Sequence, residues 1–122
     1  MEKNIKILVV DDQAFMFSMI QKIFKDNGYS NIEYAPNGLK AIEMDKANNY
    51  DLITLDITMP ELNGIEAAKK IFEIHPDKKI LMVSAMGQES IIREAITVGV
   101  RNFLLKPFTP DKFVEKLNKT LI

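Results

Sequence analysis

Residues 5–12 read IKILVVDD, an almost wholly apolar run that stops at two carboxylates, Asp11 and Asp12. Two later apolar runs also stop at a charged side chain, namely residues 52–55 before Asp56 and residues 103–105 before Lys106. If these runs are neighbouring parallel strands, their ends meet at one edge of one sheet, where open α/β folds bind ligands. Three carboxylates and one ammonium group would then share a single pocket.

Short apolar runs alternate with stretches of helical period along the chain. The runs begin near residues 5, 32, 52, 80 and 102, and the helical stretches cover about residues 15–24, 38–47, 63–72, 91–96 and 109–121. This alternation is typical of a doubly wound parallel sheet. We therefore predict one flavodoxin-like α/β domain over residues 1–122, with five parallel strands in the order 2-1-3-4-5. Residues 32–35 include a charge and suit an edge strand.

The helical stretches carry start signals and apolar faces. Asn63 can cap a helix, with Glu66 three residues on, and Thr109 can cap the last helix ahead of a proline. The first stretch has an apolar stripe made of Phe15, Met16, Met19, Ile20, Ile23 and Phe24. Phe17 lies off that stripe and is either a docking anchor or a chance exposed aromatic. The fourth stretch has an unusually broad apolar face, so that either its core face is wide or one isoleucine faces a partner.

Composition limits the classes of function. The chain has 122 residues, 47% of them hydrophobic, and 16 basic residues against 17 acidic ones give a net charge of −1. This balance produces no field that attracts nucleic acid or an anionic membrane, so we expect neither as a partner. No cysteine is present, and the first apolar run is too short for a signal peptide or a membrane span. We expect a complete, cytoplasmic and monomeric protein.

Each charged group has a structural explanation when it is taken alone. Asp11 and Asp12 could cap the next helix, which is a common role for aspartate. Asp56 could be an ordinary turn residue, and Lys106 could be a solvated loop charge. All of these groups, together with Ser84 after the fourth apolar run, nevertheless fall at the ends of predicted strands. That coincidence favours a functional pocket.

Closely packed carboxylates repel each other unless a cation lies among them. Oxygen ligands favour a hard ion such as Mg²⁺. Zinc is disfavoured, because there is no cysteine and the only histidine, His75, lies at the far end of a predicted helix. A carboxylate can attack phosphorus and carry the phosphoryl group as an aspartyl phosphate. A lysine ammonium and a serine hydroxyl would each hold a phosphoryl oxygen.

Four segments together resemble the receiver domain of response regulators in two-component signalling. They are VVDD at residues 9–12, DITMPELNG at 56–64, SAM at 84–86 and KPF at 106–108. Within that family, the segments DDQAFM, DITMPE and SAMGQ look most like those of the single-domain chemotaxis members. The resemblance covers the whole chain in order. It implies a signalling switch that is no enzyme beyond its own phosphoryl transfer and dephosphorylation.

The resemblance implies a role for each residue of the pocket. Asp56 would accept the phosphoryl group from a histidine kinase. Asp12 and Asp56 would bind Mg²⁺ directly, with the backbone carbonyl of Thr58 as a third protein ligand. Asp11 would act on the ion largely through water.

The resemblance also implies how the signal would spread. Lys106 would bind the phosphoryl group, Ser84 would swing toward it, and Phe103 would turn inward into the vacated space. The peptide bond before Pro107 would be cis. The surface of the fourth helix, fifth strand and fifth helix would bind a flagellar motor switch or another target protein. A phosphatase would assist dephosphorylation.

Other functions compete with this interpretation. A stand-alone phosphorelay or phosphate-sink receiver would differ only in its partners. An aspartate-nucleophile phosphohydrolase usually needs a second aspartate two residues on as general acid, and that position holds Thr58. A nucleotide-binding module would need a glycine-rich loop after the first strand, where Asp11 and Asp12 stand instead.

Overall fold

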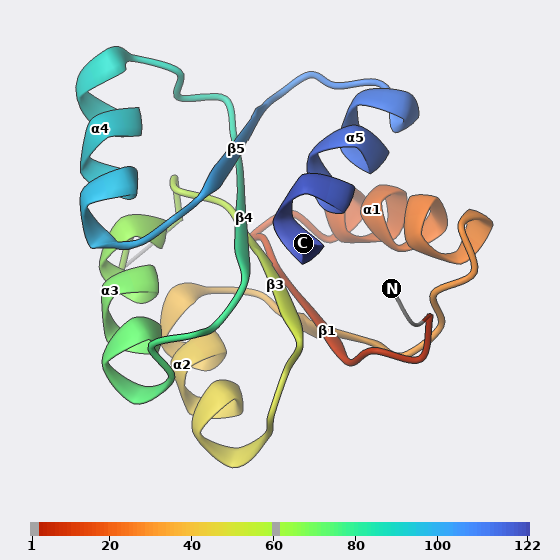
Figure 1. Ribbon diagram of the computed structural model, residues 1–122, viewed down its shortest axis with the longest axis horizontal. Coiled ribbons are helices and arrows are strands. Elements are labelled where there is room, and N and C mark those ends of the chain that lie inside the picture. Colours follow the sequence, from red (N-terminus) through yellow and green to blue (C-terminus); the bar gives the residue numbers. More distant parts are fainter. Residues whose placement is uncertain (1–2, 60–61) are drawn as a thin grey trace.

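The structure is a computed structural model in which residues 3–59 and 62–122 are described. Over these residues five strands alternate with five helices, as predicted (Figure 1). The strands are β1 (Ile7–Val10), β2 (Ile32–Ala35), β3 (Leu52–Leu55), β4 (Ile80–Ser84) and β5 (Asn102–Leu105). The helices are α1 (Ala14–Asp26), α2 (Gly38–Ala47), α3 (Gly64–Ile74), α4 (Glu89–Val98) and α5 (Pro110–Leu121). Pro60 and Glu61 of the DITMPELNG segment lie outside the described residues.

The strands form one parallel sheet in the order β2-β1-β3-β4-β5, which confirms the predicted topology. β1 lies inside the sheet and pairs with both β2 and β3. Every residue of β1, β3 and β4 is buried, because helices cover both faces of the sheet. β2 and β5 form the edges and are only partly buried, so the expectation of an edge strand at residues 32–35 is confirmed.

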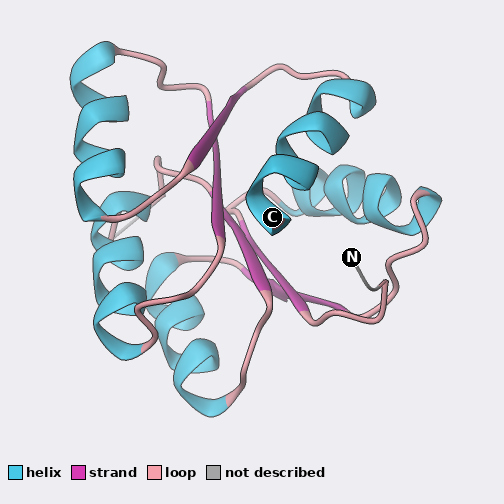
Figure 2. Cartoon of the chain, in the orientation of Figure 1, coloured by secondary structure: helices cyan, strands magenta, loops and turns pink. Residues whose placement is uncertain are grey.

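Helices lie on both faces of the sheet (Figure 1 and Figure 2). α2, α3 and α4 cover one face, and α1 and α5 cover the other. Successive side chains of a strand point to opposite faces. β1 therefore sends Leu8 and Val10 into one hydrophobic core, and it sends Ile7 and Val9 into the other. None of the helices in the described part of the chain combines the length and apolar character needed to cross a lipid bilayer.

The predicted helix caps form. The Asn63 side chain accepts a hydrogen bond from the backbone N–H of Glu66 at 2.9 Å. The Thr109 hydroxyl accepts one from the backbone N–H of Lys112 at 3.1 Å. These bonds satisfy backbone donors that a helix start leaves unpaired. They fix the first turns of α3 and α5 next to the loops that leave β3 and β5.

The apolar stripe predicted for α1 is only partly right. Met16, Ile20, Ile23 and Phe24 are buried, but Phe15 is 66% exposed and Met19 is 41% exposed. The core-facing side of α1 is therefore narrower than the stripe. Phe17 is neither an outward anchor nor simply exposed, because its ring stacks on Tyr34 of β2, with centroids 4.4 Å apart and an interplanar angle of 20°. The periodicity of α1 could not reveal this contact, because Tyr34 lies on a different element, the edge strand β2.

Gly64 packs against the backbone just after β3. Its N–H donates a hydrogen bond to the Ile57 carbonyl at 2.8 Å, and a Cβ at this position would lie 2.0 Å from the Asp56 carbonyl oxygen. An added methyl group must therefore displace backbone. We expect Gly64→Ala to lower the free energy of unfolding by about 3 kcal/mol, at the upper end of typical overpacking.

Urea denaturation of Gly64→Ala, with the m-value monitored, measures this loss. Glu66→Ala is the matched control, because it changes an exposed side chain in the same first turn of α3. A Gly64→Ala midpoint equal to that of the unmodified chain would contradict the close approach.

Candidate metal centre at the carboxyl edge of the sheet

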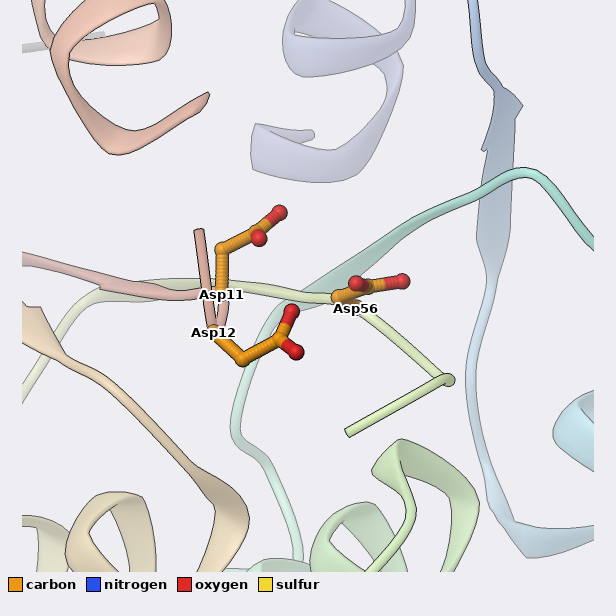
Figure 3. Close-up of side chains that lie close together, drawn as sticks. All are labelled: Asp11, Asp12 and Asp56. Atoms are coloured by element: carbon orange, nitrogen blue, oxygen red, sulfur yellow. The ribbon is translucent and has the colours of Figure 1, made fainter. Parts of the chain in front are cut away.

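Three carboxylates meet where β1 and β3 end. Asp11 and Asp12 follow β1 directly, and Asp56 follows β3. β1 and β3 are adjacent and in register, so their carboxyl ends lie side by side. One carboxylate oxygen from each of the three residues lies within 4.8 Å of the other two. Figure 3 shows the three side chains close together at the ends of these strands.

The three carboxylates differ in environment. Asp11 and Asp56 are buried, with 1% and 6% of their surfaces exposed, whereas Asp12 is exposed. The Oδ1 atom of Asp11 accepts a hydrogen bond from the backbone N–H of Gln13 at 3.0 Å. Gln13 itself is the N-cap of α1, and no side-chain hydrogen bond caps that helix. The structural explanation of Asp11 and Asp12 as helix caps is therefore wrong.

Lys106 reaches the carboxylates from the end of β5. Its Nζ donates to Asp11 Oδ2 at 2.9 Å and lies 3.5 Å from Asp56 Oδ2. Its backbone N–H donates to the carbonyl of Ser84 at 2.9 Å, which ties it to the end of β4. The Lys106–Pro107 peptide bond is cis. The ammonium group thus neutralises part of the negative charge that the ends of β1 and β3 bring together.

The electrostatics of the pocket disfavour the charged form of Asp56. Burial raises the pKa of the Asp56 carboxyl above its ordinary value, and the nearby Asp11 charge adds to this effect. The Lys106 ammonium and a backbone hydrogen bond from Ile57 act in the opposite direction but do not cancel it. One lysine is therefore not enough to balance the pocket, and a further cation would stabilise the ionised carboxylate.

The donor set fits a magnesium ion. Mg²⁺ takes oxygen ligands octahedrally at 2.0–2.1 Å, so two oxygens on one ion are about 3 Å apart when adjacent and about 4 Å apart when opposite. The three carboxylate oxygens all lie within 4.8 Å of one another, which is close to that range. A small movement of the carboxylates toward one another would bring their oxygens to the spacing that the ion requires. A water between the ion and one aspartate would have the same effect. Mg²⁺ commonly keeps several waters in such sites.

The loops after β3 and β4 meet beside the carboxylates. The Thr58 hydroxyl donates to the Met86 sulfur at 3.0 Å, so these two loops touch. Ser84 is fully buried, and its Oγ accepts a hydrogen bond from the Met86 backbone N–H at 3.1 Å. Phe103 is half-buried and packs against the core beneath α2, α3 and α4. Asp11, Asp12, Asp56 and Lys106 thus line the pocket, and Thr58 and Ser84 lie in the loops beside it. Phe103 belongs to the core and has no contact with these carboxylates among the described hydrogen bonds and ion pairs.

Tyr34 is a residue of this region that sequence reasoning missed. Its hydroxyl donates to the backbone carbonyl of Asp11 at 2.7 Å. Burial raises the pKa of Tyr34 above its ordinary value, with smaller contributions from the Asp11 and Asp12 charges, so the hydroxyl stays protonated and remains a donor. Only its position, one residue before the end of an edge strand next to β1, could have pointed to it.

Comparison with known proteins agrees with this architecture. Residues 7–118 match the family model described as response regulator receiver domain. The chain is 47% identical to the chemotaxis protein CheY of Bacillus subtilis over 116 residues, which are 95% of this chain and 97% of the relative. It is also 47% identical to the chemotaxis protein CheY of Thermotoga maritima over 114 residues, 93% of this chain and 95% of the relative.

Solved structures give the same result. CheY from a CheX–CheY–BeF3–Mg complex of Borrelia burgdorferi superposes with a TM-score of 0.93 at 30% identity, covering 97% of this chain and 90% of that one. Vibrio cholerae chemotaxis protein CheY4 superposes with a TM-score of 0.90 at 28% identity, covering 97% and 99%. Sequence, topology and the placement of the acidic cluster agree: this chain belongs to the response regulator receiver domain family.

Proposed function

We propose that this chain is a phosphorylation-activated switch of the CheY type and that Asp56 is its phosphoacceptor. The observation that carries the proposal is the arrangement of Asp56 within 4.8 Å of two further carboxylates and 3.5 Å from the Lys106 ammonium. Asp56 lies at the end of the central strand β3, where main-chain atoms hold it firmly. The raised pKa of Asp56 means that the pocket stabilises its carboxylate anion poorly. This favours attack of the carboxylate on phosphorus once a cation is bound.

The pocket residues would hold Mg²⁺. Asp12 and Asp56 are the direct carboxylate ligands in this proposal, the Thr58 backbone carbonyl is a third, and Asp11 acts through water. A bound Mg²⁺ would neutralise phosphoryl oxygens as they approach the carboxylates. Lys106 supplies a second positive charge, since its Nζ already lies 2.9 Å from Asp11 Oδ2 and 3.5 Å from Asp56 Oδ2.

The proposed reaction is a phosphoryl transfer to a carboxylate. An oxygen of Asp56 attacks the phosphorus of a phosphohistidine on the kinase, and the P–N bond breaks as the new P–O bond forms. The electron pair stays on the departing imidazole nitrogen. Lys106 then exchanges its hydrogen bond with Asp11 for one with a phosphoryl oxygen, because the new group adds a charge of about −1.5 to −2.

The signal leaves the pocket through β5 and the loop after β4. Lys106 continues β5, and Ser84 ends β4, so movements at the phosphoryl group pull directly on both strands. In this proposal the Ser84 hydroxyl leaves the Met86 N–H for the phosphoryl group. Phe103, which is the second residue of β5 and is partly buried, then moves further inward.

The proposed output surface is formed by α4, β5 and α5. A hollow of about 480 Å³ lies there, and its lining includes Phe103, Leu105, Phe108 and Lys112. Ile96 of α4 is 60% exposed, which agrees with an isoleucine that faces a partner. Chemotaxis and the flagellar motor switch are the proposed context, since the similar proteins are named chemotaxis proteins. The Borrelia relative forms a complex with CheX. For this chain a phosphatase is proposed as a further partner.

Acetyl phosphate with Mg²⁺ tests the proposal. We expect one phosphoryl group per chain, at Asp56, visible by intact-mass spectrometry and removed by hydroxylamine. Omission of Mg²⁺ should prevent the adduct. Sustained release of phosphate over many turnovers without a stoichiometric adduct would instead identify a phosphohydrolase, and a phosphorylated residue other than Asp56 would overturn the assignment.

Dephosphorylation should be slow without a partner. Met86 lies beside Thr58 at the mouth of the pocket, and its thioether is a poor hydrogen-bond partner for an attacking water. Met86→Glu supplies a carboxylate that can orient that water, and we expect about a tenfold to hundredfold faster loss of phosphate, below the full range of general base catalysis. The decay of radiolabelled protein measures this rate. Met86→Leu is the control of similar size, and equal decay in both variants would count against the role of this position.

A further inference from the structure

The Tyr34 side chain is held at both ends. Its hydroxyl donates to the Asp11 backbone carbonyl at 2.7 Å, and its ring stacks on Phe17 of α1 at 4.4 Å between centroids. On the same edge strand, the Ala35 carbonyl accepts a hydrogen bond from the Asp11 N–H at 3.2 Å. β2 therefore contacts the main chain of Asp11 on both its N–H and its C=O, and it joins that residue to the first turns of α1.

The peptide unit held by Tyr34 is the one that joins Asp11 to Asp12. The Asp11 side chain has further partners of its own, the Gln13 N–H and the Lys106 ammonium. The Asp12 side chain is exposed, and no hydrogen bond to it is found within residues 3–59 and 62–122. Its direction therefore depends on the backbone on which it stands. That backbone is the peptide whose carbonyl Tyr34 fixes.

We propose that Tyr34 is a positioning residue for the magnesium site: its hydroxyl fixes the Asp11–Asp12 peptide and so aims the Asp12 carboxylate at the ion. This inference rests on the proposed function in one respect, that Mg²⁺ binds among the three carboxylates. Mg²⁺ demands near-ideal octahedral geometry, which makes the site sensitive to small displacements of a ligand. Loss of a group that orients a metal ligand typically weakens metal binding by 10–100-fold.

Tyr34→Phe removes the hydroxyl and keeps the ring on Phe17. We expect its Mg²⁺ dissociation constant, measured by isothermal titration calorimetry, to rise about tenfold, at the low end for an orienting partner. Tyr50→Phe is the matched control, because the Tyr50 hydroxyl also donates a hydrogen bond, to Glu33 at 2.5 Å, away from the carboxylates. Its Mg²⁺ affinity should equal that of the unmodified chain even if its stability falls.

A kinetic readout separates positioning from general stability. In phosphorylation by acetyl phosphate, the Mg²⁺ concentration for half-maximal rate should shift in Tyr34→Phe by the same factor as the dissociation constant. The rate at saturating Mg²⁺ should match that of the unmodified chain, because the filled site is the same. Phe17→Leu, which loses the stack but keeps the hydroxyl, should show a smaller shift and serves as the test if Tyr34→Phe does not fold.

Three outcomes decide the matter. Unchanged Mg²⁺ affinity in Tyr34→Phe, with normal binding by the unmodified chain, would overturn the role of Tyr34 and leave the proposed function standing. An equal shift in Tyr50→Phe would also overturn it, since the effect would then follow from stability alone. Absence of Mg²⁺ binding by the unmodified chain would overturn the proposed function and this inference together.

Discussion

Asp56→Asn is expected to take up no phosphoryl group from acetyl phosphate at any Mg²⁺ concentration. Asparagine keeps the size of the side chain at the end of β3 but removes the nucleophilic oxygen anion. The fold should remain intact, because Asp56 is held mainly through its backbone, whose N–H donates to the Val10 carbonyl at 3.1 Å. Intact-mass spectrometry and circular dichroism measure the two effects. A phosphorylated Asp56→Asn protein, or an unfolded one, would contradict the assignment.

The same variant should be more stable than the unmodified chain when Mg²⁺ is absent. The pKa of Asp56 is raised in the folded chain, chiefly by burial. The protonated Asp56 carboxyl contributes to the free energy of unfolding of the unmodified chain. This contribution is fully present below the ordinary pKa of aspartate, and it is lost as the pH rises through the raised pKa of the folded chain. The advantage of Asp56→Asn should therefore be small in acid and reach its full size above that pKa, near neutral pH.

Urea midpoints measured from acidic to neutral pH in metal-free buffer test this sign. Asp77→Asn is the control, because Asp77 is exposed and lies outside the pocket. Added Mg²⁺ should stabilise the unmodified chain and the Asp77→Asn protein but have much less effect on Asp56→Asn. An Asp56→Asn protein that is less stable at neutral pH would show that the carboxylate is a structural residue.

Lys106→Ala should separate phosphorylation from its consequences. The ammonium group contacts Asp11 and lies near Asp56, so its loss removes positive charge from the reacting centre. We expect phosphorylation to be about a hundredfold slower, as when one electrostatic donor is removed, yet still to reach completion. The phosphorylation-dependent change that we propose for β5 and α4 should be absent, because no side chain then links the phosphoryl group to β5.

Hydrogen exchange of α4 and β5 before and after phosphorylation measures this coupling. The unmodified chain and the control Lys40→Ala, which removes an exposed lysine from α2, should both show a phosphorylation-dependent change. Lys106→Ala should show none at equal phosphate occupancy. A normal exchange response in Lys106→Ala would mean that the signal leaves the pocket by another route.

Much of this site followed from the sequence because topology alone determines it. Asp11, Asp12, Asp56 and Lys106 directly follow apolar runs, and parallel strands place their carboxyl ends at one edge. Once the strand order was predicted, the carboxylates that follow β1 and β3 had to be neighbours, and the long side chain of Lys106 reaches them from β5. The helix caps at Asn63 and Thr109 could be predicted equally well, since each cap depends on a pattern of only a few consecutive residues.

Side-chain partners across elements could not be predicted in this way. The stack of Phe17 on Tyr34 and the hydrogen bond from Tyr34 to the Asp11 carbonyl depend on the angle between α1 and the edge strand β2. The exposure of Phe15 likewise depends on how α1 is rotated about its axis. Hydrophobic periodicity defines a face of a helix, but packing decides where that face ends.

The most direct test of the central claim is crystallographic. Crystals of the chain soaked in Mn²⁺, which takes the same oxygen ligands as Mg²⁺, should give one anomalous difference peak in the pocket. The peak should lie within coordination distance of a carboxylate oxygen of Asp12 and of Asp56 and of the Thr58 carbonyl. Absence of a peak there, or an ion bound by Asp12 without Asp56, would contradict the account.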